Sequence, residues 1–179
     1  LVAGTASLTV VNASATLVNL RSPSDGTVIV RTATATLSND SLTSGPAVNG
    51  RDQSAQFTAS SWVHVYYIWN GTTLGTLSSA CSPSDANGAC SQSFGLNLPS
   101  GYTHYAYIGA WRVLTNNIYA TGTQRGTAFF YHATQASVNN GPNTTETSID
   151  IASLAAPNSL RVRANARMVT VGGSVVGDY

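Results

Sequence analysis

Hydrophobic and polar positions alternate along this chain in short runs, and turn-forming dipeptides separate one run from the next. In residues 28–37, Val and Thr side chains share one face, while Ile, Ala, Leu and one Arg share the other. Alternation with a period of two predicts strands. The runs predicted as strands are 8–20, 28–37, 53–57, 62–69, 72–77, 102–114, 118–121, 127–132, 146–151 and 160–168.

About ten short strands with no helical pattern predict an all-β chain with little or no helix. We expect one domain over residues 1–179, folded as an antiparallel, jelly-roll-like β-sandwich. Residues 1–20 are predicted to form an extended N-terminal arm or strand. Neither an internal repeat nor a linker divides the chain.

The run Trp62–Trp69 is hydrophobic on both faces, which is typical of a strand covered on both sides, and we place it centrally. Asn70-Gly71 then predicts a type I′ hairpin turn. In the later long strand, alternation places Tyr105, Tyr107, Gly109 and Trp111 on one face. The residues that we predict as core aromatics are Trp62, Tyr66, Trp69 and Trp111. Exposed Tyr and Trp stacking on sugars, or anchoring a subunit interface, is the alternative.

Composition narrows the class of protein. Charged residues make up 8% of the chain, Lys is absent, and Glu146 is its only Glu, so helix surfaces would lack their usual residues. A hydrophobic content of 42% argues against disorder. A net charge of +1 gives no electrostatic footprint for nucleic acid, and no apolar run approaches the roughly 20 residues of a membrane span. We therefore expect neither nucleic acid nor membrane insertion.

Residues that could perform catalysis are few and scattered. His64, His104 and His132 lack the spacing of metal ligands, and we interpret them as packed or rim histidines. The acids mostly lie in turns, where aspartates cap their own backbone. The sequence predicts no enzyme, no metal and no cofactor. A glycosidase remains the enzymatic alternative, and it would need two carboxylates about 5–10 Å apart in a groove.

Cys81 and Cys90 enclose a turn-rich segment, and two interpretations stay open. A local disulfide would suit an oxidising setting, whereas two free thiols would suit assembly in a cytosol. In both cases the enclosed loop is a candidate contact surface, with Ser84, Asp85 and Asn87 as its polar residues.

The last two predicted strands each have one apolar and one charged face. Their charged residues are Glu146 and Asp150 on the first strand, and Arg161, Arg163 and Arg167 on the second. We predict ion pairs between the strands or with a neighbouring subunit. An anion-binding stripe of arginines is the alternative.

Four motifs can be compared with known families. They are Asn49-Gly50-Arg51-Asp52, Ser60-Ser61-Trp62-Val63-His64-Val65-Tyr66-Tyr67-Ile68-Trp69, Leu98-Pro99-Ser100-Gly101-Tyr102-Thr103-His104-Tyr105 and Ile108-Gly109-Ala110-Trp111-Arg112. With the later Ala156-Pro157-Asn158 turn, they resemble a domain that recurs in bacteriophage virion proteins, chiefly tail fibres, head fibres and decoration proteins. The likeness covers about half to two-thirds of the chain. Its motifs are turns and core strands, with no catalytic residue among them.

This resemblance implies a virion surface protein that assembles as a homo-oligomer, in fibre-like relatives a trimer. It also implies other virion proteins as partners. The Cys81–Cys90 segment and the all-Arg set of cations depart from the family pattern and leave the attachment target open, with a host-surface glycan as one candidate. Further strands are expected after residues 160–171, from a longer chain or a neighbouring one. The alternatives are a capsid decoration or head-fibre protein that grips the shell through residues 1–20, and a lectin-like adhesin domain.

Overall fold

The computed structural model describes residues 2–7, 9–32, 35–83, 96–115, 117–125, 128–132 and 155. This part of the chain contains twelve strands and no helix, which confirms the prediction of an all-β protein. About ten strands were expected for the whole chain, and the described part alone has twelve. The strands predicted at 146–151 and 160–168 lie outside the described residues, with Glu146, Asp150, Arg161, Arg163 and Arg167.

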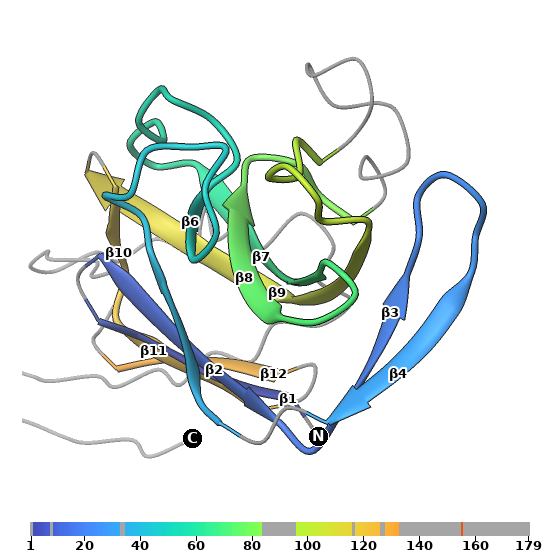
Figure 1. Ribbon diagram of the computed structural model, residues 1–179. Coiled ribbons are helices and arrows are strands. Elements are labelled where there is room, and N and C mark those ends of the chain that lie inside the picture. The colour runs from blue at the N-terminus through green and yellow to red at the C-terminus, as the bar shows by residue number, and fades with distance from the viewer. Residues whose placement is uncertain are drawn as a thin grey trace, which may run out of the picture.

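The strands form two sheets (Figure 1). The five-stranded sheet has the order β12 (Ala128–Tyr131), β11 (Gly122–Arg125), β1 (Val2–Ser7), β2 (Val10–Ala15) and β5 (Leu37–Asp40). The seven-stranded sheet has the order β4 (Val28–Thr32), β3 (Leu17–Arg21), β9 (His104–Thr115), β7 (Trp62–Trp69), β8 (Leu74–Ser79) and β6 (Gly50–Arg51), and β10 (Ile118–Tyr119) pairs with β9. Among the strands that the structure describes, only the short β6–β8 pair is parallel.

One long hairpin connects the sheets. It pairs β2 with β5 in the first sheet and β3 with β4 in the second. The prediction of single strands over 8–20 and 28–37 was therefore wrong. The pattern of burial shows why: the buried residues have odd numbers in β2 and even numbers in β3, so the alternation is interrupted between the two strands. Of the two forms expected for residues 1–20, an arm or a strand, residues 2–7, 10–15 and 17–20 have the second.

The two sheets share one core. It joins Val11 and Ala13 of β2 to Val63 and Val65 of β7 and to Trp111 of β9. The central position of β7 is confirmed, because it lies between β8 and β9 with all of residues 63–68 buried. Of the predicted core aromatics, Trp111 and Tyr66 are fully buried. Trp62 and Trp69 lie at the ends of β7 and are only partly buried, so they are boundary residues.

A β-bulge in β9 corrects the predicted faces of that strand. Val65 pairs with Gly109, but the next residue, Tyr66, pairs with Tyr107, so Ile108 is an extra residue. The extra residue reverses the alternation. Trp111 therefore joins the core between the sheets, whereas Tyr107 packs against Tyr66 on the opposite face.

The bulge is held from the other sheet. Gln124 of β11 is buried, and its Nε2 donates a hydrogen bond of 2.6 Å to the carbonyl of Ile108. A Cβ at Gly109 would lie 1.6 Å from Gln124 Oε1. Glycine at 109 thus leaves the space that the amide occupies.

One turn prediction and one strand prediction also need correction. The loop between β7 and β8 is Asn70–Thr73, with Trp69 paired to Leu74, rather than a two-residue turn. Asn70 Oδ1 accepts hydrogen bonds from the backbone N–H groups of Thr72 and Thr73, which closes the longer loop. Residues 53–57 form no strand: the N–H of Phe57 donates to Asn117 Oδ1, and the carbonyl of Gln53 accepts from the N–H of Gly45.

Candidate functional site: a tyrosine-lined groove

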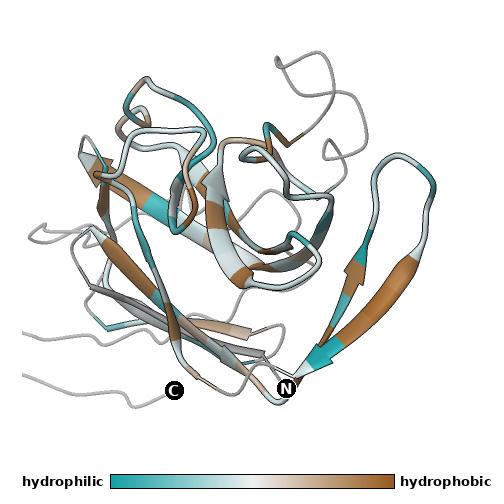
Figure 2. Cartoon of the chain, viewed as in Figure 1, coloured by the Kyte–Doolittle hydropathy of each residue, from teal (hydrophilic) through white to brown (hydrophobic). Residues whose placement is uncertain are grey.

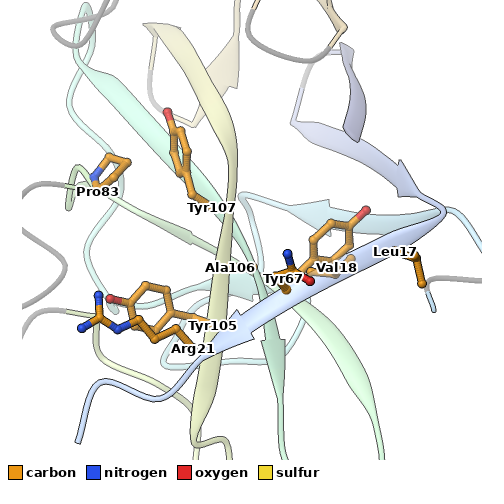
Figure 3. Close-up of a pocket in the computed structure, with 9 residues that line it drawn as sticks. Leu17, Val18, Arg21, Tyr67, Pro83, Tyr105, Ala106 and Tyr107 are labelled. Carbon is orange, nitrogen blue, oxygen red and sulfur yellow. The ribbon is translucent and has the colours of Figure 1, made fainter. Parts of the chain in front are cut away.

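A groove opens where two neighbouring strands of the seven-stranded sheet separate. β3 and β9 pair at one position only, Arg21 with Tyr105. Beyond that pair the strands diverge and leave a cavity of about 460 Å³ (Figure 3). The residues that line it are Leu17, Val18, Asn19, Arg21, Tyr67, Pro83, Tyr105, Ala106 and Tyr107.

The tyrosine rings of the groove are fixed by packing. Tyr66 lies behind two of them, with ring centroids 5.9 Å from Tyr105 and 5.4 Å from Tyr107. Tyr66 is itself held, because its hydroxyl donates a 2.6 Å hydrogen bond to the carbonyl of Cys81. His64 Nδ1 lies 3.3 Å from the hydroxyl of Tyr107. A ligand would therefore meet rings that are already ordered.

Tyr67 differs from the other two tyrosines. Its side chain is fully buried, and its hydroxyl has no hydrogen-bond partner in the described part of the chain. Burial raises the pKa of Tyr67 to about 12. Tyr67 packs in the core that the two sheets share, whereas Tyr105 and Tyr107 pack on the opposite face of the sheet, so the Tyr67 hydroxyl does not lie beside their rings.

Arg21 supplies the positive charge of the groove. Burial raises the pKa of Tyr105, and the charge of Arg21 partly offsets that effect. Of the acids that the structure describes, Asp25 and Asp40 cap their own turns by accepting from the N–H groups of Thr27 and Leu42. Asp52, the third, binds Ser79. No described carboxylate is therefore paired with Arg21.

The predicted contact loop begins at the edge of this groove. Pro83 lines the groove and is the last described residue before Ser84, Asp85 and Asn87. Those three residues and Cys90 lie outside the described part, so their role stays a prediction. Cys81 is buried and disulfide-bonded, and the chain has one other cysteine.

We expect alkylation of the folded protein without reductant to leave its mass unchanged, because Cys81 holds no free thiol. Replacing both cysteines (Cys81→Ser with Cys90→Ser) should lower the free energy of unfolding by about 2–3 kcal/mol, since it opens a short loop. Chemical denaturation measures the loss. Two added alkyl groups without reductant would contradict the disulfide.

A buried polar cluster lies under the motif Asn49-Gly50-Arg51-Asp52. The guanidinium of Arg51 donates to the carbonyls of Ser41 and Ser54. Asp52 Oδ2 accepts a 2.5 Å hydrogen bond from Ser79, whose own hydroxyl oxygen accepts from the N–H of Cys81. Asp52 had been assigned to an ordinary turn, and its burial is a correction. The cluster connects loop 41–49 to the base of the disulfide.

Asp52 gives the fold a pH dependence. Burial raises the pKa of its carboxyl from 3.8 to about 6. Between these two values the folded state binds more protons than the unfolded state, so stability falls as pH rises. We expect Asp52 to lower the free energy of unfolding by about 2–3 kcal/mol between pH 4 and pH 7. Denaturation curves of Asp52→Asn should lack most of this fall.

Asp25 provides the control. A hydrogen bond from the Thr27 N–H holds the pKa of its carboxyl at about 2, so it titrates below that range. Asp25→Asn should leave the slope between pH 4 and pH 7 unchanged. A wild-type protein equally stable at pH 4 and pH 7 would contradict the account of Asp52.

The histidines occupy separate places. His64 is buried, His104 is half-buried beside Thr103, and His132 is exposed beside Thr123. Among the described residues no three His, Cys, Asp or Glu side chains come together as a metal site. The part of the chain that the structure describes also has no helix of the length and apolarity needed to cross a membrane.

No protein-family model matches this chain, and neither a curated protein nor a solved structure is significantly similar to it. Function therefore has to be inferred from the residues. In the groove these are the aromatic faces of Tyr105 and Tyr107 and the guanidinium of Arg21, which no carboxylate pairs in the described part of the chain, and together they suit recognition of a ligand.

Proposed function

We propose that this chain is a non-enzymatic structural protein of a bacteriophage virion. It is displayed on the particle surface in a fibre-type assembly and contributes to attachment to the host surface. The observation that carries this proposal is the groove between β3 and β9, which offers binding groups on a rigid sheet. The resemblance to virion proteins supports the location. In its Asn49–Asp52 motif, the side chains of Arg51 and Asp52 form buried hydrogen bonds that stabilise the fold, which agrees with a structural protein.

Exposed edges support the homo-oligomer, which we propose to be a trimer. β4 is an edge strand, and Figures 1 and 2 show its hairpin with β3 projecting from the sheet with apolar residues along β4. Val28 is 60% exposed and Val30 51%. Arg31, the one charged residue of β4, lies over the Trp69 ring at 4.8 Å. An apolar edge with so little charge favours pairing with another chain.

The finer architecture is also part of the proposal. Two sheets with one shared core favour a β-sandwich of jelly-roll type. A decoration protein remains the alternative, although a shell-gripping arm at residues 1–20 has less support. β1 pairs with β2 on one side and β11 on the other, so its backbone is already occupied.

A lectin-like adhesin domain is the second candidate, and the tyrosines of the groove favour it.

Competition for adsorption to host cells tests the proposed attachment function. The purified full chain should reduce adsorption of phage carrying this protein to host cells, while heat-denatured protein should not. No competition, together with saturating, stoichiometric binding to capsids, would favour the decoration protein.

A further inference from the structure

We propose that Asn70 is a site of spontaneous covalent modification, at which the side-chain amide deamidates through a cyclic imide formed with the backbone nitrogen of Gly71. The product is an aspartyl or isoaspartyl residue in the loop between β7 and β8. The chain has four Asn-Gly pairs, at Asn49, Asn70, Asn87 and Asn140, of which the first two lie in the described part. The same dipeptide therefore occurs in two described environments, and only that of Asn70 favours the reaction.

The reaction balances with water as its only co-reactant. The backbone nitrogen of Gly71 attacks Cγ of Asn70, so that an N–C bond forms, and the bond from Cγ to Nδ2 breaks. The proton lost by the Gly71 nitrogen leaves with Nδ2 as ammonia. Water then opens the imide at either carbonyl group. One opening gives aspartate, and the other gives isoaspartate, whose main chain runs through the side-chain carbons. Nothing is oxidised or reduced.

The nucleophile of this reaction, the Gly71 nitrogen, is accessible. Its N–H donates no hydrogen bond within the described part of the chain. Gly71 is exposed, and a Cβ added to it would meet no atom within 4 Å. The loop therefore leaves this nitrogen open to water and to the base that removes its proton. Glycine also has no side chain that would hinder closure of the ring.

The electrophile, Cγ of Asn70, belongs to a carbonyl group that accepts three hydrogen bonds. Asn70 Oδ1 accepts from the N–H of Thr72 at 3.0 Å, from the hydroxyl of Thr72 at 3.1 Å and from the N–H of Thr73 at 2.7 Å. Attack at Cγ moves negative charge onto this same oxygen. Hydrogen bonds strengthen when their acceptor becomes charged, so these donors stabilise the transition state more than the ground state. The loop therefore provides an oxyanion site for the modification of its own asparagine.

Asn49 shows that the dipeptide alone is not enough. Its Oδ1 also accepts hydrogen bonds, from the N–H and the hydroxyl of Thr76. The difference lies in the nucleophile, because Gly50 is buried and its N–H donates to the carbonyl of Ala47 at 3.2 Å. The Gly50 carbonyl accepts two further hydrogen bonds from buried side chains, which fix this part of the backbone. The Gly50 nitrogen is therefore not available to attack the Asn49 side chain.

Deamidation of Asn70 changes the charge of the chain and the geometry of the loop. A carboxylate replaces a neutral amide, which takes the formal net charge from +1 to zero. Proteins without net charge associate more readily. Isoaspartate also lengthens the main chain of a loop that connects the paired residues Trp69 and Leu74. We expect the modified protein to have a lower isoelectric point, which isoelectric focusing measures.

Peptide mapping of the folded chain during incubation in mildly alkaline buffer tests the assignment. Brief digestion with chymotrypsin recovers Asn70 in the peptide 70–74 and Asn49 in the peptide 43–57. Mass spectrometry follows the replacement of NH₂ by OH in each peptide, with the protein before incubation as baseline. In the folded protein Asn70 should react at least about tenfold faster than Asn49, because the N–H next to Asn49 must first leave its hydrogen bond. In urea-denatured protein the two should react at similar rates.

Two threonine variants test the oxyanion site. Thr72→Val removes the hydroxyl that binds Asn70 Oδ1 and keeps the shape of the side chain, so the reaction should slow about fivefold, the value of one hydrogen bond. Thr73→Val is the matched control. Thr73 is also exposed, but it donates to Asn70 Oδ1 only through its backbone N–H, which valine retains. Its rate should equal that of the wild type.

Three results would count against the inference. An Asn70 peptide that stays unmodified in the folded protein, over the time in which the denatured chain reacts, would overturn it. Asn49 reacting as fast as Asn70 in the folded protein would overturn the selectivity on which it rests. Equal rates for the wild type and Thr72→Val would overturn the oxyanion site. None of these results bears on the virion location or on attachment, which the inference does not require.

Discussion

Replacing Trp111 by alanine is expected to lower the free energy of unfolding by about 3–5 kcal/mol, the usual cost of removing a buried large aromatic ring. Trp111 is fully buried in the core that the two sheets share, and its ring meets Phe129 edge to face at 6.1 Å. The hydrogen bonds between strands hold each sheet in place, so removing the ring leaves a cavity between the two sheets. Denaturation with guanidinium chloride, followed by circular dichroism, measures the loss.

Trp69→Ala is the matched control for this prediction. Trp69 is partly buried at the end of β7, with Arg31 over its ring. Because part of this ring already contacts water in the folded state, the loss should be clearly smaller than for Trp111. Equal losses for the two tryptophans would contradict the different burial of the two rings.

Gly109→Ala is expected to cost about 2–4 kcal/mol, which combines overpacking with loss of a buried hydrogen bond. The new methyl group would lie 1.6 Å from Gln124 Oε1 and displace the amide that binds the Ile108 carbonyl. Gln124→Ala alone should cost less, about 1–2 kcal/mol, because it leaves that carbonyl unpaired without a clash.

A double-mutant cycle distinguishes this clash from a general intolerance of alanine. In Gly109→Ala/Gln124→Ala the side chain that clashes is gone, so the double variant should be about as stable as Gln124→Ala. Guanidinium denaturation of all three variants provides the comparison. Losses that simply add would show that Gln124 does not fill the space at Gly109.

Local patterns predicted much of the sheet but not its irregularities. The apolar faces of β7 were readable because a central strand is hydrophobic on both sides. The burial of Trp111 was predicted, but its position on the face opposite Tyr105 and Tyr107 was not, because it follows from the bulge at Ile108, which Gln124 of the other sheet holds. The division between β2 and β3 did leave a signal, the change of buried positions from Ala15 to Val18.

The groove was less accessible to prediction than the sheets. Tyr105 and Tyr107 stood out as an aromatic face, but the approach of Arg21 to Tyr105 depends on one strand pair far apart in the sequence. The burial of Asp52 was likewise invisible, because an aspartate after Asn-Gly-Arg reads as a turn residue while Ser79 supplies its partner from β8. The position of Arg21 beside Tyr105 and the burial of Asp52 both depend on contacts between residues far apart in the sequence, which the alternation pattern does not encode.

Immunogold electron microscopy of intact phage particles with an antibody to this chain tests the central claim most directly. The expected result is label on the particle surface at the tips of tail fibres, which would agree with attachment through the groove. Label spread evenly over the head would contradict the fibre-type attachment role and favour the decoration protein. Absence of label from particles whose other surface proteins are labelled would contradict a virion location altogether.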